Sequence, residues 1–279
     1  MQKELADRAI EVLARSMSEG ISPRTPATIR VFMGHARTFL DRVGDTTPGE
    51  QEVMDWIAYC RRTRKAVSYQ NLGFFAVKAL YLANGWPWPS SLSRGPRSPQ
   101  PYELQARGMP VEEIKRLISW AKRSGSPQDR FYLALSTTYG LRREEMKRMN
   151  PEDIRPGPPL DLLLIKTGKH GRARWHEIPG EIKPLIAVYT PSPVSLSTLS
   201  NLLVRMCHLA KVDCYGWHGI RRTLANVLEP ELGEINLTSF MRWSTSGRMG
   251  ARYTLSSRSE REVDQKAFGA NIFLREWAA

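Results

Sequence analysis

Two side chains three residues apart, His218 and Arg221, are the most informative feature of this sequence. They occur in Trp-His-Gly-Ile-Arg-Arg-Thr, and their spacing places both on one face of a helix. Arginine offers paired planar donors that match phosphate oxygens, and histidine can donate or transfer a proton. Tyr253 follows downstream and could be the nucleophile that attacks such a phosphate. His-x-x-Arg alone arises often by chance, so its meaning depends on the rest of the chain.

Two further cations precede this pair in positions that suit an anion. Arg142 follows a glycine that ends one predicted helix, and it opens the next helix, whose free backbone N–H groups also face an anion. Glu145, three residues later, is expected to orient the guanidinium. Lys166 lies at a predicted hairpin tip, where its ammonium group can reach a phosphate and protonate a departing oxygen. Lys169 in the same turn competes for that role. The ordinary alternatives are a charged helix start and a turn lysine without a function.

The order of these parts resembles that of the tyrosine recombinase (phage integrase) family. The matching text is YGLRREEM, IKTGKHGRARWHEIP, WHGIRRTLAN and MRWSTSGRMGARYTL, and the resemblance covers nearly the whole chain. It implies a catalytic set of Arg142, Lys166, His218, Arg221, Trp243 and Tyr253, with Lys169 as the alternative lysine. Trp243 stands where the family has His or Trp, and it can only donate its indole N–H or pack the site. Tyr253 follows it by ten residues, one more than the commonest spacing, and the segment from Lys166 to Pro179 is also longer than usual.

The resemblance implies a site-specific recombinase or integrase that needs no metal, ATP or cofactor. Tyr253 would attack a phosphodiester of double-stranded DNA and form a 3′-phosphotyrosyl link, while Lys166 protonates the departing 5′ oxygen. The arginines, His218 and the indole of Trp243 would neutralise the charge that develops on the phosphate. The sequence has no acidic cluster suited to Mg²⁺, which agrees with this chemistry. The resemblance also implies a homotetramer on DNA, assembled by exchange of the C-terminal helix.

The elements that must position these residues are mostly helical and fall into two predicted domains. Residues 1–88 carry four amphipathic patterns, near Glu4–Ser18, Pro26–Arg42, Gln51–Arg64 and Ser68–Ala83. Residues 89–107 are rich in Pro, Ser, Gly and Arg and predict a linker. Residues 108–279 are the second domain. The predicted fold class is therefore mostly α with a small β-hairpin or sheet, and it resembles a two-domain DNA clamp with a four-helix (SAM-like) core-binding domain and an α+β catalytic domain.

Within residues 108–279, two strands are predicted at Asp161–Ile165 and Ala173–Ile178, around the polar turn that carries Lys169. Helices are predicted from Pro110, at Gln128–Thr138, from Arg142, and at Glu181–Val188, Ser195–Ala210, His218–Leu228, Leu237–Trp243 and Glu260–Trp277. The last segment has an apolar face formed by Val263, Phe268, Ile272, Phe273 and Trp277. That face predicts either docking into a neighbouring subunit or packing on its own domain.

The charge of the chain points to a polyanionic partner. Lys and Arg number 41 against 28 acidic residues, the formal net charge is +13, and the pI is near 9.9. This excess predicts nucleic acid ahead of an anionic membrane surface. The residues expected to contact the DNA backbone are Arg61, Arg62, Arg64, Lys65, Arg94, Arg97 and Lys169. For the run at 61–65 the alternative is a solvated helix end, where positive charge favours the terminal carbonyls.

Cellular setting and alternative functions follow from smaller signals. No apolar run is long enough to span a bilayer, and three cysteines predict no disulfide framework, so an intracellular setting is expected, cytoplasmic (nucleoid-associated) or nuclear. Cys207, His208, Cys214 and His218 lack the spacing of a structural zinc site, and Cys207 falls in a helical apolar pattern that predicts burial. Two other functions compatible with the motifs are an inactive architectural or regulatory DNA-binding protein and a type IB topoisomerase.

Overall fold

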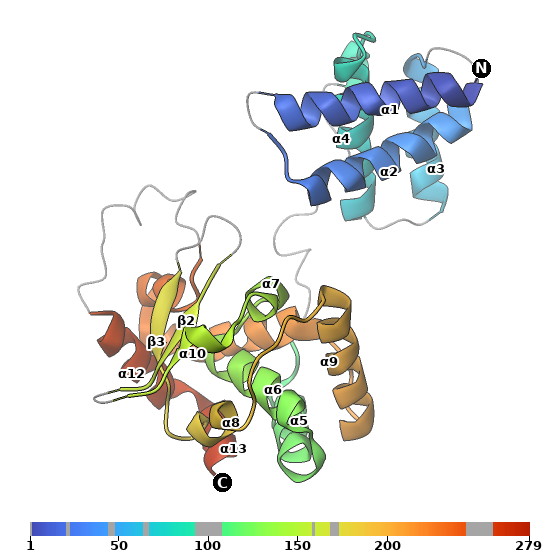
Figure 1. Cartoon of the computed structure of the whole chain (residues 1–279). Coiled ribbons are helices and arrows are strands. Elements are labelled where there is room, and N and C mark those ends of the chain that lie inside the picture. The colour runs from blue at the N-terminus through green and yellow to red at the C-terminus, as the bar shows by residue number, and fades with distance from the viewer. Residues whose placement is uncertain are drawn as a thin grey trace. The chain divides into compact units, whose positions relative to one another are not determined.

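The chain divides into two compact units, residues 1–105 and 106–279 (Figure 1). The computed structural model describes residues 2–20, 23–43, 48–63, 67–92, 108–157, 160–167, 173–243 and 259–279. Both units are mainly helical, and the second also holds a small antiparallel sheet, which confirms the predicted fold class. Within the described residues, no helix is both long and apolar enough to cross a membrane.

The first unit is a four-helix domain. It consists of α1 (Gln2–Glu19), α2 (Pro26–Val43), α3 (Glu50–Arg62) and α4 (Val67–Ala83), followed by the short 3₁₀ helix η1 (Ser90–Leu92). Each helix begins and ends within two residues of its predicted bounds, because the apolar spacing along it is strongly helical. The shared core contains Leu13 of α1, Phe39 of α2, Trp56 of α3 and Leu80 of α4, all buried.

The second unit is built around the buried helix α6. Its elements are α5 (Val111–Ser124), α6 (Pro127–Tyr139), α7 (Arg143–Lys147), η2 (Pro151–Asp153), β1 (Ile154–Arg155), β2 (Leu162–Ile165), β3 (Arg174–Glu177), α8 (Lys183–Ala187), α9 (Leu196–Ala210), α10 (Gly216–Phe240), α12 (Glu260–Ala270) and α13 (Ile272–Ala278). The strands pair antiparallel in the order β1-β2-β3. β2 and β3 confirm the predicted hairpin strands, and α12 lies beside β3 (Figure 1).

Helix α10 spans a region that the sequence predicted as two helices. It runs from Gly216 to Phe240, with a break at Gly233, where φ is 69° and ψ is 165°. A positive φ favours glycine, so the chain turns at this position without a steric penalty. The break separates the His218–Arg221 turn from the last turns of the element, which lead to Arg242 and Trp243.

The C-terminal segment packs on its own unit in this structure. The predicted single helix is two, α12 and α13, joined at Asn271, whose side-chain oxygen accepts the Phe273 N–H and whose amide donates to the Thr137 carbonyl at 3.0 Å. Trp277 Nε1 donates to Thr137 Oγ1 at 3.0 Å, which fixes α13 on α6. The apolar face of the segment is therefore covered by its own domain, the second of the two arrangements that the sequence predicted.

Candidate active site

Arg142 is held at the junction of α6 and α7. Gly140 ends α6 in the left-handed conformation at φ 60°, and Arg142 is the N-terminal cap of α7. Its backbone N–H donates to Glu145 Oε2 at 2.8 Å, and its Nη1 donates to Glu145 Oε1 at 3.0 Å. The arginine side chain remains 38% exposed, whereas that of Glu145 is 1% exposed. Glu145 thus orients a partly exposed guanidinium, as the spacing of three residues predicts.

Arg221 meets the same carboxylate from helix α10. Its side chain is 2% exposed and lies with Nη1 3.7 Å from Glu145 Oε2. Nη1 also donates to the Gly140 carbonyl and Nη2 to the Met241 carbonyl. The structure therefore brings together the two arginines of separate sequence motifs, with Glu145 between them. The carbonyl groups fix the plane of the Arg221 guanidinium.

Trp243 lies beside this arginine. The centroid of its ring is 6.0 Å from the Arg221 Cζ, close enough for a cation–π contact, and the side chain is 37% exposed. It is the last described residue before the gap at 244–258. Tyr253, the predicted nucleophile, lies in that gap, outside the described residues.

The buried charges of Arg221 and Glu145 stabilise each other in their ionised forms. Burial lowers the pKa of Arg221 to about 9, with Arg242 and Arg142 adding to the effect and Glu145 opposing it. Burial also opposes the ionisation of Glu145 more than any other effect, but Arg242, Arg221 and the Arg142 N–H together bring its pKa below the usual 4.5. At neutral pH the Glu145 carboxylate and the Arg221 guanidinium are therefore both ionised.

A further arginine beside Glu145, Arg242, is buried and was not predicted from the sequence. It follows the end of α10 at φ 54°, and its side chain is 1% exposed. Its guanidinium donates to the carbonyls of Tyr139 and Phe240 at 3.0 and 2.9 Å and to Glu145 Oε2 at 3.3 Å. The flanking text Phe-Met-Arg-Trp has no motif that signals a buried charge, so no spacing argument could have found it.

His218 lies in the first turn of α10 on an exposed surface. Desolvation is the largest cause that lowers its pKa below 6.5, followed by the positive charges of Arg222, Arg221 and Arg142. Since Arg221 and Arg142 both act on His218, the imidazole belongs to the same electrostatic site. It is neutral at pH 7 and can therefore donate one hydrogen bond and accept another.

We expect the removal of one neighbouring charge to raise the pKa of His218. Arg222→Gln takes away the cation with the largest effect of the three, so the imidazole should hold its proton to higher pH than in the wild type. Histidine ¹³C–¹H NMR titration measures this directly, with five histidines in the chain. Arg205→Gln is the matched control, because Arg205 pairs with Asp129 instead. Equal His218 titration curves in wild type and Arg222→Gln would contradict the electrostatic assignment.

Lys166 directly follows β2 and pairs with a buried carboxylate. Its Nζ lies 2.7 Å from Asp153 Oδ1, and its side chain is 37% exposed. The pair ties the start of the hairpin turn to η2. Among the contacts of the described residues, none joins Lys166 to Arg142, His218 or Arg221. Lys169 lies outside the described residues, so the choice between the two lysines stays a prediction.

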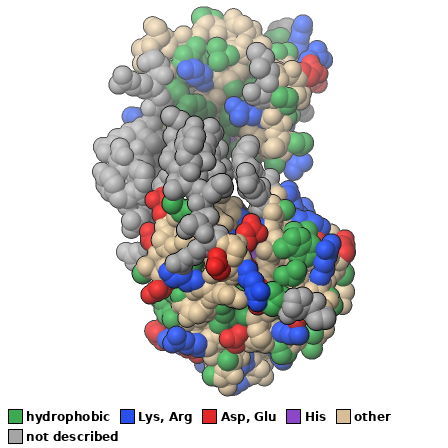
Figure 2. Space-filling model, turned by 90° about the vertical axis from the view of Figure 1, so that its left-hand side faces the viewer, with side chains coloured by type: hydrophobic (Ala, Val, Ile, Leu, Met, Phe, Trp, Pro, Cys, Tyr) green, Lys and Arg blue, Asp and Glu red, His purple; other side chains and the backbone are tan. Residues whose placement is uncertain are grey.

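Of the residues predicted to contact DNA, only Arg61 and Arg62 are described. Both are exposed at the end of α3, and Arg62 lines a hollow of about 490 Å³ together with Arg42, Glu52 and Asp55. Arg64, Lys65, Arg94 and Arg97 lie outside the described residues. On the face drawn in Figure 2, Lys and Arg side chains of the second unit stand among Asp and Glu side chains.

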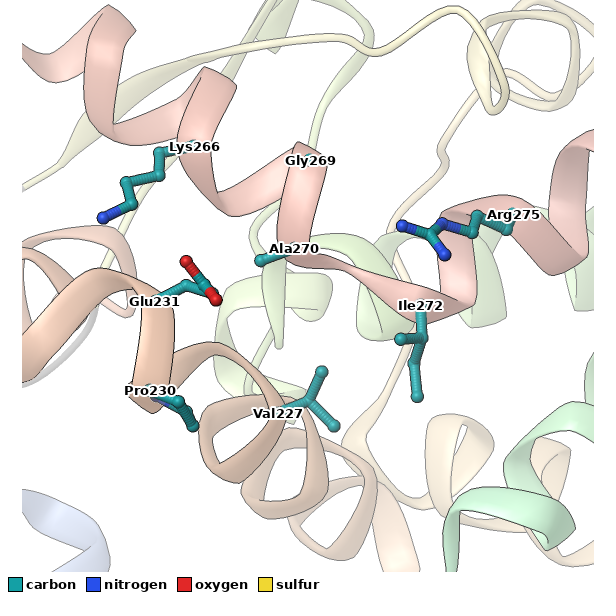
Figure 3. A pocket seen from close by; sticks show the side chains of 8 residues that line it. All are labelled: Val227, Pro230, Glu231, Lys266, Gly269, Ala270, Ile272 and Arg275. Carbon is teal, nitrogen blue, oxygen red and sulfur yellow. The ribbon is translucent and has the colours of Figure 1, made fainter.

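Another hollow, of about 560 Å³, lies between α10 and the junction of α12 and α13 (Figure 3). Val227, Ala270 and Ile272 give it an apolar wall, and Glu231 and Lys266 stand on its facing helices. None of the predicted catalytic residues lines it. This hollow is therefore separate from the arginine group.

The cysteines agree with the predicted packing. Cys207 is buried in α9 and Cys214 is exposed, and both are free thiols. Across the described ranges of the chain, no group of three or more His, Cys, Asp or Glu side chains could hold a metal ion.

Comparison with solved structures identifies the fold. No protein-family model matches the sequence, and no curated protein matches it. A lambda integrase dimer bound to a COC′ core site has a TM-score of 0.66 at 17% identity, covering 92% of this chain and 78% of that one. XerH site-specific recombinase in a post-cleavage complex with palindromic difH has a TM-score of 0.64 at 11% identity, covering 98% and 83%. Lambda integrase residues 75–356 bound to DNA gives 0.63 at 18%, covering 94% and 96%. The fold of this chain is therefore that of the tyrosine recombinases and integrases, as the order of its motifs indicates.

Proposed function

We propose that this chain is a site-specific DNA recombinase or integrase that cuts and rejoins DNA through a phosphotyrosyl link at Tyr253. The observation that carries the proposal is that Arg142 and Arg221 both pair with Glu145. The charges of the same two arginines also lower the pKa of His218. Cations from distant motifs repel one another, so they come together only where carboxylates neutralise them or where an anion binds. Here a single carboxylate, that of Glu145, contacts three arginines. The resulting positive excess suits a phosphodiester.

The residues divide the reaction between them. Tyr253 attacks the phosphorus through its phenolate oxygen, and the bond from phosphorus to the 5′ oxygen breaks. A lysine of the hairpin, Lys166 or Lys169, gives its proton to that oxygen, which leaves as a hydroxyl. Arg142, His218 and the Trp243 N–H donate to the non-bridging oxygens as negative charge develops on them. The buried guanidinium of Arg221 stabilises that negative charge electrostatically. Resealing reverses these steps with a 5′-hydroxyl, so neither metal nor ATP is needed.

A nicked suicide substrate tests the proposal. It lets the cut strand diffuse away, so the covalent complex accumulates and can be seen on a denaturing gel, and mass spectrometry of the tryptic digest identifies the modified residue. We expect a nucleotide adduct on Tyr253. DNA binding without an adduct would instead indicate an architectural or regulatory DNA-binding protein on this fold. An adduct that leads to relaxation of supercoiled DNA without strand exchange would indicate a type IB topoisomerase.

The general acid can be assigned by changing the leaving group. We expect Lys166→Met to slow cleavage of an ordinary strand by on the order of 10²-fold, because no proton reaches the 5′ oxygen. A strand with sulfur at that bridging position needs no proton to leave, so it should be cleaved by Lys166→Met at nearly the wild-type rate. Lys169→Met is the matched variant in the same turn. If the sulfur strand rescues Lys169→Met alone, then Lys169 is the acid and the role given to Lys166 is wrong.

Assembly, domain roles and cellular setting belong to the same proposal. Residues 1–88 and 108–279 would grip double-stranded DNA from opposite sides, joined by the linker 89–107, with Arg61, Arg62, Arg64, Lys65, Arg94, Arg97 and Lys169 on the backbone. A homotetramer on DNA would exchange the C-terminal helix, and the protein would work inside the cell at the nucleoid or nucleus. Because α13 is fixed on α6 through Trp277 and Thr137, exchange requires that hydrogen bond to break. Sedimentation of the complex on DNA with two sites would give its stoichiometry.

A further inference from the structure

Arg242 occupies a backbone conformation that its residue type disfavours. Its φ of 54° lies in the left-handed region, where a Cβ crowds the following carbonyl. Its N–H donates to Ser239 at 3.1 Å and the N–H of Trp243 donates to Thr238 at 3.0 Å, so the end of α10 closes around this residue. A conformation of this kind persists only where surrounding contacts determine it. The Arg242 side chain adds further contacts of this kind.

The Arg242 guanidinium connects three elements inside the second unit. It donates to the last residue of α6, to the end of α10 and to Glu145 of α7, as given above. The nitrogen that donates to Phe240, Nη1, also lies 3.0 Å from His176 Nε2 on β3. Burial, more than any other effect, lowers the pKa of His176 to about 4, so the ring is neutral. Its Nδ1 lies 3.0 Å from Asp264 Oδ1, and since a carboxylate only accepts, Nδ1 carries the proton and Nε2 accepts from Arg242.

Arg242 helps to keep the buried Glu145 carboxyl group ionised, which it contacts at 3.3 Å. Desolvation drives the carboxyl group toward its neutral form, and the charge of Arg242 is the largest single effect that opposes it, with Arg221 and Arg142 adding to it. A protonated Glu145 would lose its attraction for Arg142, whose half-exposed side chain is held to the protein by that contact. Arg242 thereby acts on Arg142, the arginine proposed to bind the phosphate, through the carboxylate of Glu145.

We propose that Arg242 is a positioning residue for the cleavage reaction, holding Glu145 ionised so that Glu145 can orient Arg142 and Arg221. The inference rests on the proposed function for its effect on DNA cleavage. The effect of Arg242 on the ionisation of Glu145 does not depend on that function. The Arg242 side chain is 1% exposed, so its role does not require contact with DNA.

Two readouts test the inference on the full chain. The first is the titration of the Glu145 carboxyl carbon, followed by NMR on protein with ¹³C-labelled glutamate and assigned with Glu145→Gln. We expect its midpoint to be higher in Arg242→Met than in the wild type, with Arg242→Lys between them. The second is single-turnover cleavage of the suicide substrate, measured with DNA affinity. Cleavage by Arg242→Met should fall by about 10²-fold, with affinity within about threefold, because the loss is in preorganised charge.

Arg174→Met is the matched control. Arg174 is similarly buried in the same unit, but it pairs with Asp264 at 2.7 Å and, among the contacts of the described residues, is linked to Glu145 only through Asp264, His176 and Arg242. It should leave the Glu145 titration unchanged and affect cleavage far less. If Arg242→Met does not fold, Arg242→Lys carries both readouts. An unshifted Glu145 titration, or equal cleavage losses in Arg242→Met and Arg174→Met, would overturn the inference. A wild type that forms no adduct refutes the proposed function instead, and the titration still decides whether Arg242 controls Glu145.

Discussion

Tyr253→Phe should abolish the covalent protein–DNA complex while leaving DNA binding intact. Phenylalanine keeps the ring but lacks the phenolic oxygen, so no bond to phosphorus can form and the accumulated adduct should fall by at least about 10³-fold. The positive charges of the site, that of Arg142 among them, are unchanged, and the affinity for DNA should therefore stay within about twofold of the wild-type value. The suicide substrate measures the first quantity, and a gel shift under matched salt measures the second.

The matched control for this change is Tyr215→Phe. Tyr215 precedes α10 in the same unit and lies three residues before His218, so its loss tests a tyrosine near the site that is not the predicted nucleophile. We expect Tyr215→Phe to form the adduct at close to the wild-type rate. Should the adduct persist in Tyr253→Phe and vanish in Tyr215→Phe, the nucleophile has been assigned to the wrong residue.

Local periodicity predicted the four helices of the first unit well because each of them buries one face. In α2 the residues that pack inward recur at helical spacing, and the structure follows that pattern to within one residue at either end. β1 was missed because two residues, Ile154 and Arg155, carry no period of their own. It exists by pairing with Leu162 and Leu163 of β2, a tertiary contact that no local pattern encodes.

The contacts of the candidate site also fall into those that sequence spacing predicts and those that depend on tertiary packing. Arg142 and Glu145 are three residues apart in one short helix, so their contact follows from spacing alone. The meeting of Arg221 with Glu145 required the order of motifs, since spacing cannot bring α10 to α7. Arg242 and His176 lay beyond both kinds of argument, because their burial comes from how β3 and α12 close over the end of α10. The sequence therefore indicated the residues that we propose bind the phosphate, and the structure added the buried residues beside them.

Arg221→Met should impair both the reaction and the fold. Methionine fills a similar volume but leaves the carbonyls of Gly140 and Met241 without their donor. An unsatisfied buried acceptor costs about 1–3 kcal/mol, and the relief of one buried charge offsets part of that, so we expect a loss of about 2–4 kcal/mol in the free energy of unfolding. Cleavage should fall by on the order of 10³-fold at saturating DNA, since a preorganised positive charge behind the phosphate is removed.

Arg221→Lys tests whether the cleavage defect of Arg221→Met comes from the lost charge or from the lost contacts of the planar guanidinium. An ammonium group keeps the charge, but it lacks the planar fork that reaches the carbonyls of Gly140 and Met241 together, so most of the cleavage defect should remain. Arg222→Met is the matched control, because Arg222 is the next residue on α10 and only half-buried. Urea unfolding gives the stability of each variant, and single-turnover cleavage is compared at temperatures where all are folded. If Arg221→Met cleaves DNA as fast as Arg222→Met does, then the buried arginine supports the fold alone and takes no part in stabilising the phosphate.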